Sequence, residues 1–191
     1  MQSFRRRLPH RYPEGKWLFL TWHLHGSLPH AMYPPPGRTN SGQAFVWMDR
    51  YLDTAAGGPK YLLNDQIARA VMTSLHRGID LGHYQLRAWV LMPNHVHVLL
   101  LPLVSPSRLL QSLKGAAARE ANRILGRTGE PFWQAESYDH WVRDDRQMDR
   151  IVAYIENNPV SAGLVSMAED WAWSSATAER TCAETNLGAT D

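Results

Sequence analysis

Two histidines, His95 and His97, stand in the middle of the otherwise apolar stretch WVLMPNHVHVLL, residues 89–100. Side chains alternate between the two faces of a β-strand, so both imidazoles would point one way while Val96 and Val98 point the other way. Neutral imidazole is the commonest protein ligand for borderline divalent metals. The spacing therefore predicts half of a metal site, with coordination positions left for a third ligand, water and substrate.

The same spacing has a second interpretation, because two histidines at positions i and i+2 can simply lie on a solvated face of a sheet. His23 and His25, in the sequence HLH, show the identical spacing at the end of another expected strand, beside Gly26. Spacing alone does not distinguish the two pairs.

A tyrosine and an asparagine one helical turn apart form the second candidate group. In AYIENNPV, Tyr154 and Asn158 would project from the same face of a helix. A phenolate can attack phosphorus, but a tyrosine with a pKa of about 10 is mostly protonated at neutral pH and needs a nearby cation that polarises the phosphate. An isolated tyrosine is more often a half-buried core residue, and Asn158 beside Pro159 can also serve only to end the helix.

The elements that would position these groups follow from apolar periodicity and turn residues. Strands are expected at residues 17–27, 83–93, 94–102 and near 138–142, with a tight turn at Pro93 and Asn94. Helices are expected at residues 64–82 and 105–126 and within the stretch 145–165, the first capped by Asn64 and the last stopped by Pro159. Their expected core positions are Ile67, Val71, Leu75 and Ile79 in the first helix and Leu109, Leu113, Ala117 and Ala121 in the second. The order of elements indicates an α+β fold, an antiparallel sheet with helices packed on it, close to the ferredoxin-like plan.

One long segment, Leu28 to Pro59, is punctuated by proline and glycine clusters, and we expect a loop or lid with no more than a short helical turn there. The sequence does not show whether it covers a site. The apolar patch WAWSS near the C-terminus is expected to tuck back onto the body.

Length and composition indicate one domain. The chain has 191 residues, 44% of them hydrophobic, which is enough to bury a core. We expect this domain to cover residues 1–176 and residues 177–191 to form a C-terminal tail without apolar periodicity. The single cysteine, Cys182, excludes an internal disulfide and a cysteine-rich zinc module. With one cysteine, a reduced, cytoplasmic setting is expected. No apolar run reaches the length of about 18 residues that spans a membrane.

The two candidate groups together resemble a known family. MPNHVHVLL resembles the HUH motif (histidine, apolar residue, histidine) of single-tyrosine transposases. Residues 132–165, FWQAESYDHWVRDDRQMDRIVAYIENNPVSAGLV, resemble the second signature block of the REP-associated tyrosine transposases, bacterial relatives of the insertion-sequence-200 transposases. WAWSSA also fits, and the resemblance covers most of residues 17–176.

The resemblance implies a fold, an activity and a set of site residues. It implies that Tyr154 attacks DNA, forms a 5′-phosphotyrosine bond and releases a free 3′-hydroxyl. It implies that His95, His97 and Asn158 hold Mg²⁺ or Mn²⁺, with Asn157 as the fallback third ligand. The implied substrate is single-stranded DNA, in the form of hairpins of palindromic extragenic sequences, and no nucleotide cofactor is implied. Tyr138, in ESYDHW, is a competing nucleophile.

Basic residues near these motifs suit a DNA partner, although the formal net charge is only +2. Most of the 20 basic residues are arginines, which match phosphate oxygens well but can also reflect codon usage. The candidate DNA contacts are Arg119, Arg123, Arg143, Arg146 and Arg150, with Arg127 and an arm formed by Arg5, Arg6 and Arg7 as further candidates. Pairing with adjacent acids such as Asp144, Asp145 and Asp149 is the alternative. Trp133 and Trp141 could stack on unpaired bases or pack in the core.

Two other functions remain compatible with the sequence. One is a domesticated DNA-hairpin-binding protein without transposition activity. The other is a zinc hydrolase built on His95 and His97, which would leave the tyrosine block unexplained. Monomer and homodimer are both compatible with the sequence, and a DNA-bound protein of this kind would be associated with the nucleoid.

Overall fold

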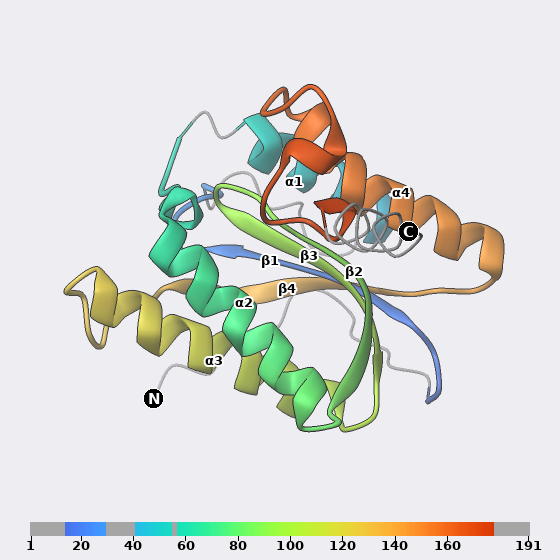
Figure 1. Cartoon of the computed structure of the whole chain (residues 1–191), viewed down its shortest axis with the longest axis horizontal. Coiled ribbons are helices and arrows are strands. Elements are labelled where there is room, and N and C mark those ends of the chain that lie inside the picture. Colours follow the sequence, from blue (N-terminus) through green and yellow to red (C-terminus); the bar gives the residue numbers. More distant parts are fainter. Residues whose placement is uncertain (1–13, 30–40, 55–56, 178–191) are drawn as a thin grey trace, which may run out of the picture.

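The computed structural model describes residues 14–29, 41–54 and 57–177. In these ranges the chain forms a four-stranded antiparallel sheet with four α-helices packed on it (Figure 1). The strands are β1 (Leu18–Leu24), β2 (Tyr84–Leu91), β3 (His95–Pro102) and β4 (Trp133–Trp141), in the order β2-β3-β1-β4. The helices are α1 (Ser41–Thr54), α2 (Asp65–Asp80), α3 (Pro106–Ile124) and α4 (Asp145–Ser161). The predicted α+β class is confirmed.

The register of the two central strands places four polar side chains on one face of the sheet. Thr21 of β1 lies opposite His97 of β3, and His23 lies opposite His95. Directly opposite residues in an antiparallel pair share a face. The two imidazoles therefore point the same way, as the spacing of two predicts.

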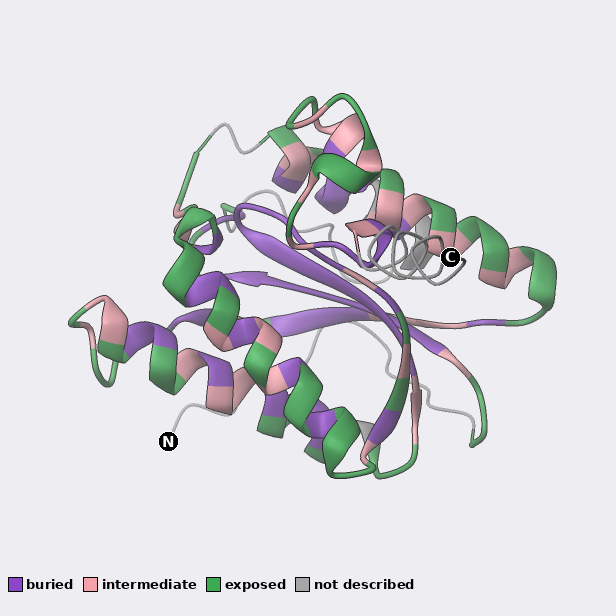
Figure 2. Ribbon diagram, viewed as in Figure 1, coloured by how far each residue is buried: buried purple, intermediate pink, exposed green. Residues whose placement is uncertain are grey.

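The two faces of the sheet are covered by different pairs of helices. Leu20, Val96 and Val98 point to the face that packs against α2 and α3. Phe19 and Leu99 point to the opposite face, where they pack against α4 and Phe45 of α1. Figure 1 shows this division, and Figure 2 shows that the central strands consist mainly of buried residues, whereas the helices carry both buried and exposed residues.

Two helices form as the sequence predicts. The side chain of Asn64 accepts hydrogen bonds from the amides of Gln66 and Ile67 and so begins α2. The expected core positions of α2 and α3 are buried, except that Ile79 at the end of α2 is 39% exposed. Their buried positions are Ile67, Val71, Leu75, Leu109, Leu113, Ala117 and Ala121.

The expectation for residues 28–59 was wrong, since the segment contains the 14-residue helix α1. The proline and glycine clusters flank this helix rather than interrupt it, and Phe45, Met48 and Leu52 repeat at helical spacing within it. Residues 30–40 and 55–56 lie outside the described residues.

Two further boundaries differ from the prediction. Helix α4 continues through Pro159 to Ser161, because a proline near the end of a helix removes only one donor and the amide of Ala162 still bonds the carbonyl of Asn158. Strand β4 begins at Trp133 rather than near Tyr138.

The apolar patch after α4 lies along the edge strand β2. The amide of Leu91 bonds the carbonyl of Trp173, and Trp171 Nε1 donates to the carbonyl of Leu91. Ser175 Oγ donates to Glu156 of α4 and also contacts the backbone of Trp89. This segment therefore ties α4 to the sheet, as expected of WAWSS.

Residues 178–191 and Arg5 to Arg7 lie outside the described ranges. Within those ranges, no helix has the length and apolar character needed to cross a membrane.

Candidate active site

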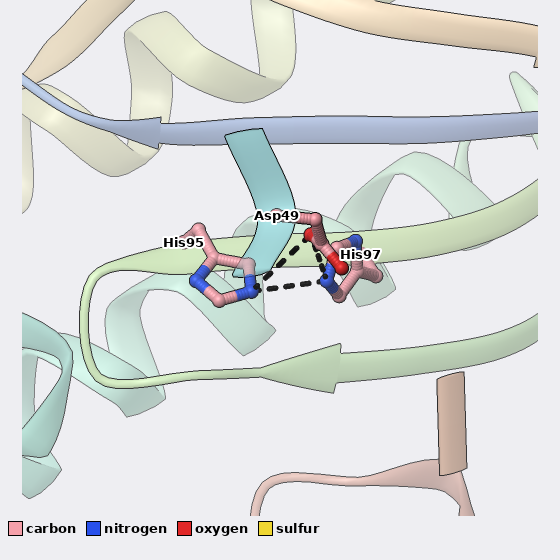
Figure 3. A group of neighbouring side chains, drawn as sticks. All are labelled: Asp49, His95 and His97. Atoms are coloured by element: carbon pink, nitrogen blue, oxygen red, sulfur yellow. Dashed lines mark hydrogen bonds and ion pairs between the residues drawn. The ribbon is translucent and has the colours of Figure 1, made fainter. Parts of the chain in front are cut away.

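A buried group of three side chains lies where α1 packs over β3 (Figure 3). The Nε2 atoms of His95 and His97 are 3.0 Å apart. Asp49 reaches in from α1, and its Oδ1 lies 3.3 Å from His97 Nε2 and 4.0 Å from His95 Nε2. Both imidazoles are 0% exposed and Asp49 is 4% exposed. The group offers two nitrogen ligands and one oxygen ligand at a single point.

Hydrogen bonds on the far side of each ring aim the Nε2 atoms at this point. His95 Nδ1 lies 2.6 Å from Asn94 Oδ1, which can only accept, so Nδ1 carries the proton and Nε2 presents a lone pair. His97 Nδ1 lies 2.7 Å from the hydroxyl of Thr21. Partners of this kind orient the imidazoles of metal sites and fix their tautomers.

The distances fit one divalent cation. Two ligand atoms that each lie about 2.1 Å from an ion are about 3.0–3.4 Å apart when the angle between them is about 90–110°. The Nε2–Nε2 distance of 3.0 Å and the distance of 3.3 Å from His97 Nε2 to Asp49 Oδ1 are in this range, whereas the distance of 4.0 Å from His95 Nε2 to Asp49 Oδ1 is longer and requires a wider angle at the ion. Among the described residues Asp49 Oδ1 is also buried without a hydrogen-bond partner, and a cation would supply the interaction that it lacks.

Burial sets the protonation of two groups here. Burial, with smaller contributions from His97 and His23, holds the pKa of His95 well below its usual value, so the ring is in the neutral form that binds metals. Asp53 lies one turn after Asp49, and its Oδ1 is 3.6 Å from His95 Nε2. Burial, with a further contribution from Asp49, raises the pKa of Asp53 to about 7, while His97 opposes the rise.

Tyr154 lies beside His97, and the two ring centroids are 5.6 Å apart. Phe19 and Phe45 also border the tyrosine ring, at centroid distances of 5.9 and 6.1 Å. The hydroxyl of Tyr154 is buried and has no hydrogen-bond partner among the described residues. The structure thus places the phenol of α4 and the histidines of β3 on the same face of the sheet.

Asn158 is 2% exposed, and its Oδ1 is buried without a hydrogen-bond partner among the described residues. An amide oxygen in this state is compatible with a ligand role. Asn157 is exposed, and its Nδ2 donates to the carbonyl of Ala153 within α4. Asn157 therefore lies along the surface of its own helix and does not suit a buried ion.

Tyr138 shares the face but is packed as a core aromatic. It lies opposite Thr21, is 6% exposed, and stacks on Phe45 with ring centroids 4.3 Å apart. Burial, together with Asp139, raises the pKa of Tyr138 to about 12. Its hydroxyl is therefore harder to ionise than an ordinary phenol.

The second pair of histidines does not converge. His23 is 2% exposed, and its Nδ1 donates to Ser27 Oγ and to the carbonyl of Leu24 at 2.9 and 3.1 Å. His25 is exposed, because β1 ends at Leu24 and the alternation of faces does not extend beyond it. Burial, the largest effect, lowers the pKa of His23 to about 4.

The five candidate DNA-contact arginines lie on, or just before, helices that cover opposite faces of the sheet. Arg143, Arg146 and Arg150 are exposed at or just before the start of α4, the helix that carries Tyr154. Arg119 and Arg123 are exposed on α3, behind the sheet. Two arginines of this region have acidic partners, since Arg123 pairs with Glu120 and Arg127 with Glu130.

The two tryptophans considered for base stacking differ in exposure. Trp133 is 8% exposed and packs edge-on against Trp22, so it belongs to the core. Trp141 is half-buried, with the guanidinium of Arg143 5.9 Å from its ring centroid. Of the two, only Trp141 keeps an accessible ring.

Neither Asp49 nor Asp53 was expected from the sequence. The sequence did hold a signal for them, because Phe45, Asp49 and Asp53 are spaced four residues apart on one face of α1. Each acid directly follows an apolar residue of the helix, Met48 or Leu52. Acidic residues on the apolar stripe of a helix must be paired or ligated when the helix packs.

Comparisons with known proteins agree with this fold. The family model described as Transposase IS200 like matches residues 58–158, which include His95, His97, Tyr154 and Asn158. A Haemophilus influenzae protein described as a REP-associated tyrosine transposase is 39% identical over 44 residues, or 23% of this chain. That match spans only a quarter (25%) of the relative's length.

A solved structure of a REP-associated tyrosine transposase bound to a REP hairpin is also similar, with a TM-score of 0.55. It is 20% identical in sequence, and the superposition covers 91% of this chain and 82% of that one, so the two share a fold. Since the family match covers just over half of the residues, this chain belongs to the IS200-like transposase family.

Proposed function

We propose that this chain is a metal-dependent single-stranded DNA transposase that cleaves and rejoins DNA through a covalent bond to Tyr154. The observation that carries the proposal is the distance of 5.6 Å between the ring centroids of Tyr154 and His97. The Nε2 atom of His97 belongs to the group of three ligand atoms that could hold one cation. A nucleophile and a site for an activating ion are thereby in reach of one phosphate.

The chemical step is a transesterification. The Oη of Tyr154 forms a bond to phosphorus while the bond from phosphorus to the 3′-oxygen of the preceding nucleotide breaks. The phenol loses its proton, and the departing 3′-oxygen gains one. Because one phosphate ester replaces another, the step needs no nucleotide cofactor, and its reversal with a different 3′-hydroxyl rejoins the DNA.

The neighbouring residues have distinct roles in this proposal. His95, His97 and Asp49 hold the ion, and Asn158 is a further candidate ligand one turn after the nucleophile. When bound, Mg²⁺ or Mn²⁺ would polarise the phosphate and stabilise the charge that develops on its oxygens.

Other residues position the ligands and the nucleophile. Asn94 and Thr21 orient the imidazoles through their Nδ1 atoms. Phe19 and Phe45 border the Tyr154 ring and exclude water from it.

We propose that the substrate is a DNA hairpin with a single-stranded flank. The hairpin bound in the solved structure of a relative supports this choice. Arg143, Arg146 and Arg150 are the proposed phosphate contacts, because they lie at the start of the helix that carries Tyr154. Arg119 is a candidate for a second contact behind the sheet, whereas Arg123 is already paired with Glu120. A protein with this substrate would act on the nucleoid in the cytoplasm, as a monomer or a homodimer.

A hairpin-binding protein without cleavage is the second candidate. The observation that favours it is the closure of the site, since both histidines are 0% exposed and the Tyr154 hydroxyl is buried. A zinc hydrolase is a weaker candidate, because it gives no role to the tyrosine beside His97.

A covalency assay separates the first two functions. The full chain is incubated with Mg²⁺ and a pool of single-stranded hairpin oligonucleotides with varied flanks, labelled at their 3′ ends. A 5′-phosphotyrosine bond would leave the labelled downstream fragment attached to the protein on a denaturing gel. Hairpin retention under native conditions without any denaturation-resistant adduct would favour the binding protein.

A further inference from the structure

Helix α1 lies before the residues that the family model matches, yet it places two carboxylates at the histidine pair. Asp49 Oδ1 is 3.3 Å from His97 Nε2, and Asp53 Oδ1 is 3.6 Å from His95 Nε2. The two acids are one helical turn apart, so they point in the same direction. Both Oδ1 atoms are buried without a hydrogen-bond partner among the described residues.

This arrangement is costly without a cation. Two neighbouring carboxylates repel one another, and their buried Oδ1 atoms have lost their hydration, although the side chain of Asp53 remains 21% exposed. A lone pair of His95 Nε2 also faces the group, because its Nδ1 proton is engaged by Asn94. One divalent ion would satisfy all of these atoms, two from β3 and two from α1.

Apart from the ring contacts of Phe45, few contacts between α1 and the sheet are seen among the described side chains. Met48 and Leu52 form a small cluster with Leu28 that is separate from the two main cores, and of the α1 side chains that the structure describes, only Phe45 reaches the core beside Tyr154. One hydrogen bond joins the helix to the β2–β3 turn, from Asn94 Nδ2 to the carbonyl of Leu52 at 3.0 Å. A shared ion would therefore supply a large part of the interaction between α1 and the sheet.

We propose that α1 is the second half of the metal site, with Asp53 as a ligand beside Asp49, and that the bound ion holds α1 closed over His97 and Tyr154. The presence of the ion rests on the proposed function. The role of Asp53 as a ligand and the closure of α1 by the ion go beyond that function. With α1 in place the histidines are 0% exposed, so in this proposal a DNA phosphate reaches the ion only after α1 has lifted.

The test measures binding of Mn²⁺ and the mobility of α1 in the full chain. Mn²⁺ affinity is measured by titration calorimetry, and amide hydrogen exchange of residues 41–54 is followed by mass spectrometry with and without Mn²⁺. The variants are Asp53→Asn, Asp49→Asn and the double variant. Asp80→Asn is the matched control, since it makes the same change at an exposed position of α2. Melting curves without metal should show each variant folded, because Asp→Asn keeps the shape and removes a charge.

We expect Mn²⁺ to slow exchange across α1 in the wild type and in Asp80→Asn. Asp53→Asn should weaken Mn²⁺ binding by roughly tenfold or more, and the double variant should lose the slowing of α1 altogether. Wild-type Mn²⁺ affinity in both single variants, with α1 exchange unchanged by metal, would overturn the proposal. Failure of the proposed function looks different: Mn²⁺ would bind and slow α1 exchange, but no DNA adduct would form.

Discussion

Asn94 connects His95 to helix α1 through a single amide. Its Oδ1 accepts from His95 Nδ1 at 2.6 Å, and its Nδ2 donates to the carbonyl of Leu52 at 3.0 Å. The tautomer of a candidate metal ligand and the position of the helix above it therefore depend on one fully buried side chain.

Replacing Asn94 tests this connection. Asn94→Ala should lower Mn²⁺ affinity by about 10–100-fold, because His95 loses the partner that fixes its ring. The buried carbonyl of Leu52 also loses its donor, so the free energy of unfolding should fall by about 1–3 kcal/mol. Calorimetric Mn²⁺ titration and urea denaturation measure the two effects. Asn157→Ala, at an exposed position of α4, is the control, and equal effects in both variants would contradict the assignment.

The histidines should matter for chemistry more than for DNA affinity. His97→Ala is expected to keep hairpin binding within a few-fold of the wild type, because affinity comes mainly from arginine contacts to phosphates. Cleavage should fall by at least about a hundredfold through loss of the ion. Gel-shift and cleavage assays measure the two quantities, with His25→Ala as the control from the other His-x-His pair. Near wild-type cleavage by His97→Ala would exclude the metal assignment.

Stability should depend on pH through His23. Burial lowers the pKa of His23 from its usual 6.5 to about 4, so below pH 6.5 the unfolded chain binds a proton that the folded chain does not. The free energy of unfolding is therefore highest above pH 6.5 and falls as the pH drops from 6.5 toward 4. At pH 5 the loss due to His23 amounts to about 2 kcal/mol.

Urea denaturation at pH 8 and pH 5, with EDTA present, measures this loss. In His23→Gln the difference between the free energies of unfolding at pH 8 and pH 5 should shrink by about 2 kcal/mol. His25→Gln, at an exposed position, should leave this difference unchanged. Part of the acid sensitivity should remain in His23→Gln, because burial also lowers the pKa of His95. An unchanged difference in His23→Gln would show that His23 does not titrate as its burial implies.

Most of the fold could be predicted from local patterns. The period of two in β3 placed His95 and His97 on one face, and Asn64 marked the start of α2 because an N-cap is a local signal. Tyr154 and Asn158 belong to one helix, so their proximity to each other was also local information.

The part of the site that comes from α1 could not be predicted in the same way. Asp49 and Asp53 meet the histidines only through tertiary packing, and spacing carries no information on contacts between distant segments. The proline and glycine clusters around α1 also masked its apolar stripe of Phe45, Met48 and Leu52.

Bound metal should stabilise the folded chain. At a free Mn²⁺ concentration of about one hundred times Kd, the free energy of unfolding should rise by about 2.7 kcal/mol over its value in EDTA. The gain should vanish in the His95→Ala/His97→Ala double variant, which has no imidazole to offer. Urea denaturation in EDTA and in Mn²⁺ measures it, and an equal gain in both proteins would show that Mn²⁺ binds elsewhere.

The central claim is that Tyr154 is the nucleophile, and mass mapping of the DNA-linked peptide tests it most directly. Wild type, Tyr154→Phe and Tyr138→Phe are incubated with Mg²⁺ and the 3′-labelled hairpin pool, denatured, digested and analysed. Tyr154→Phe removes one oxygen and keeps the ring beside Phe19 and Phe45, so the fold should survive. The account predicts a nucleotide-bearing peptide that contains Tyr154 in wild type and in Tyr138→Phe, and no adduct in Tyr154→Phe. An adduct that persists in Tyr154→Phe and maps to Tyr138 would contradict it.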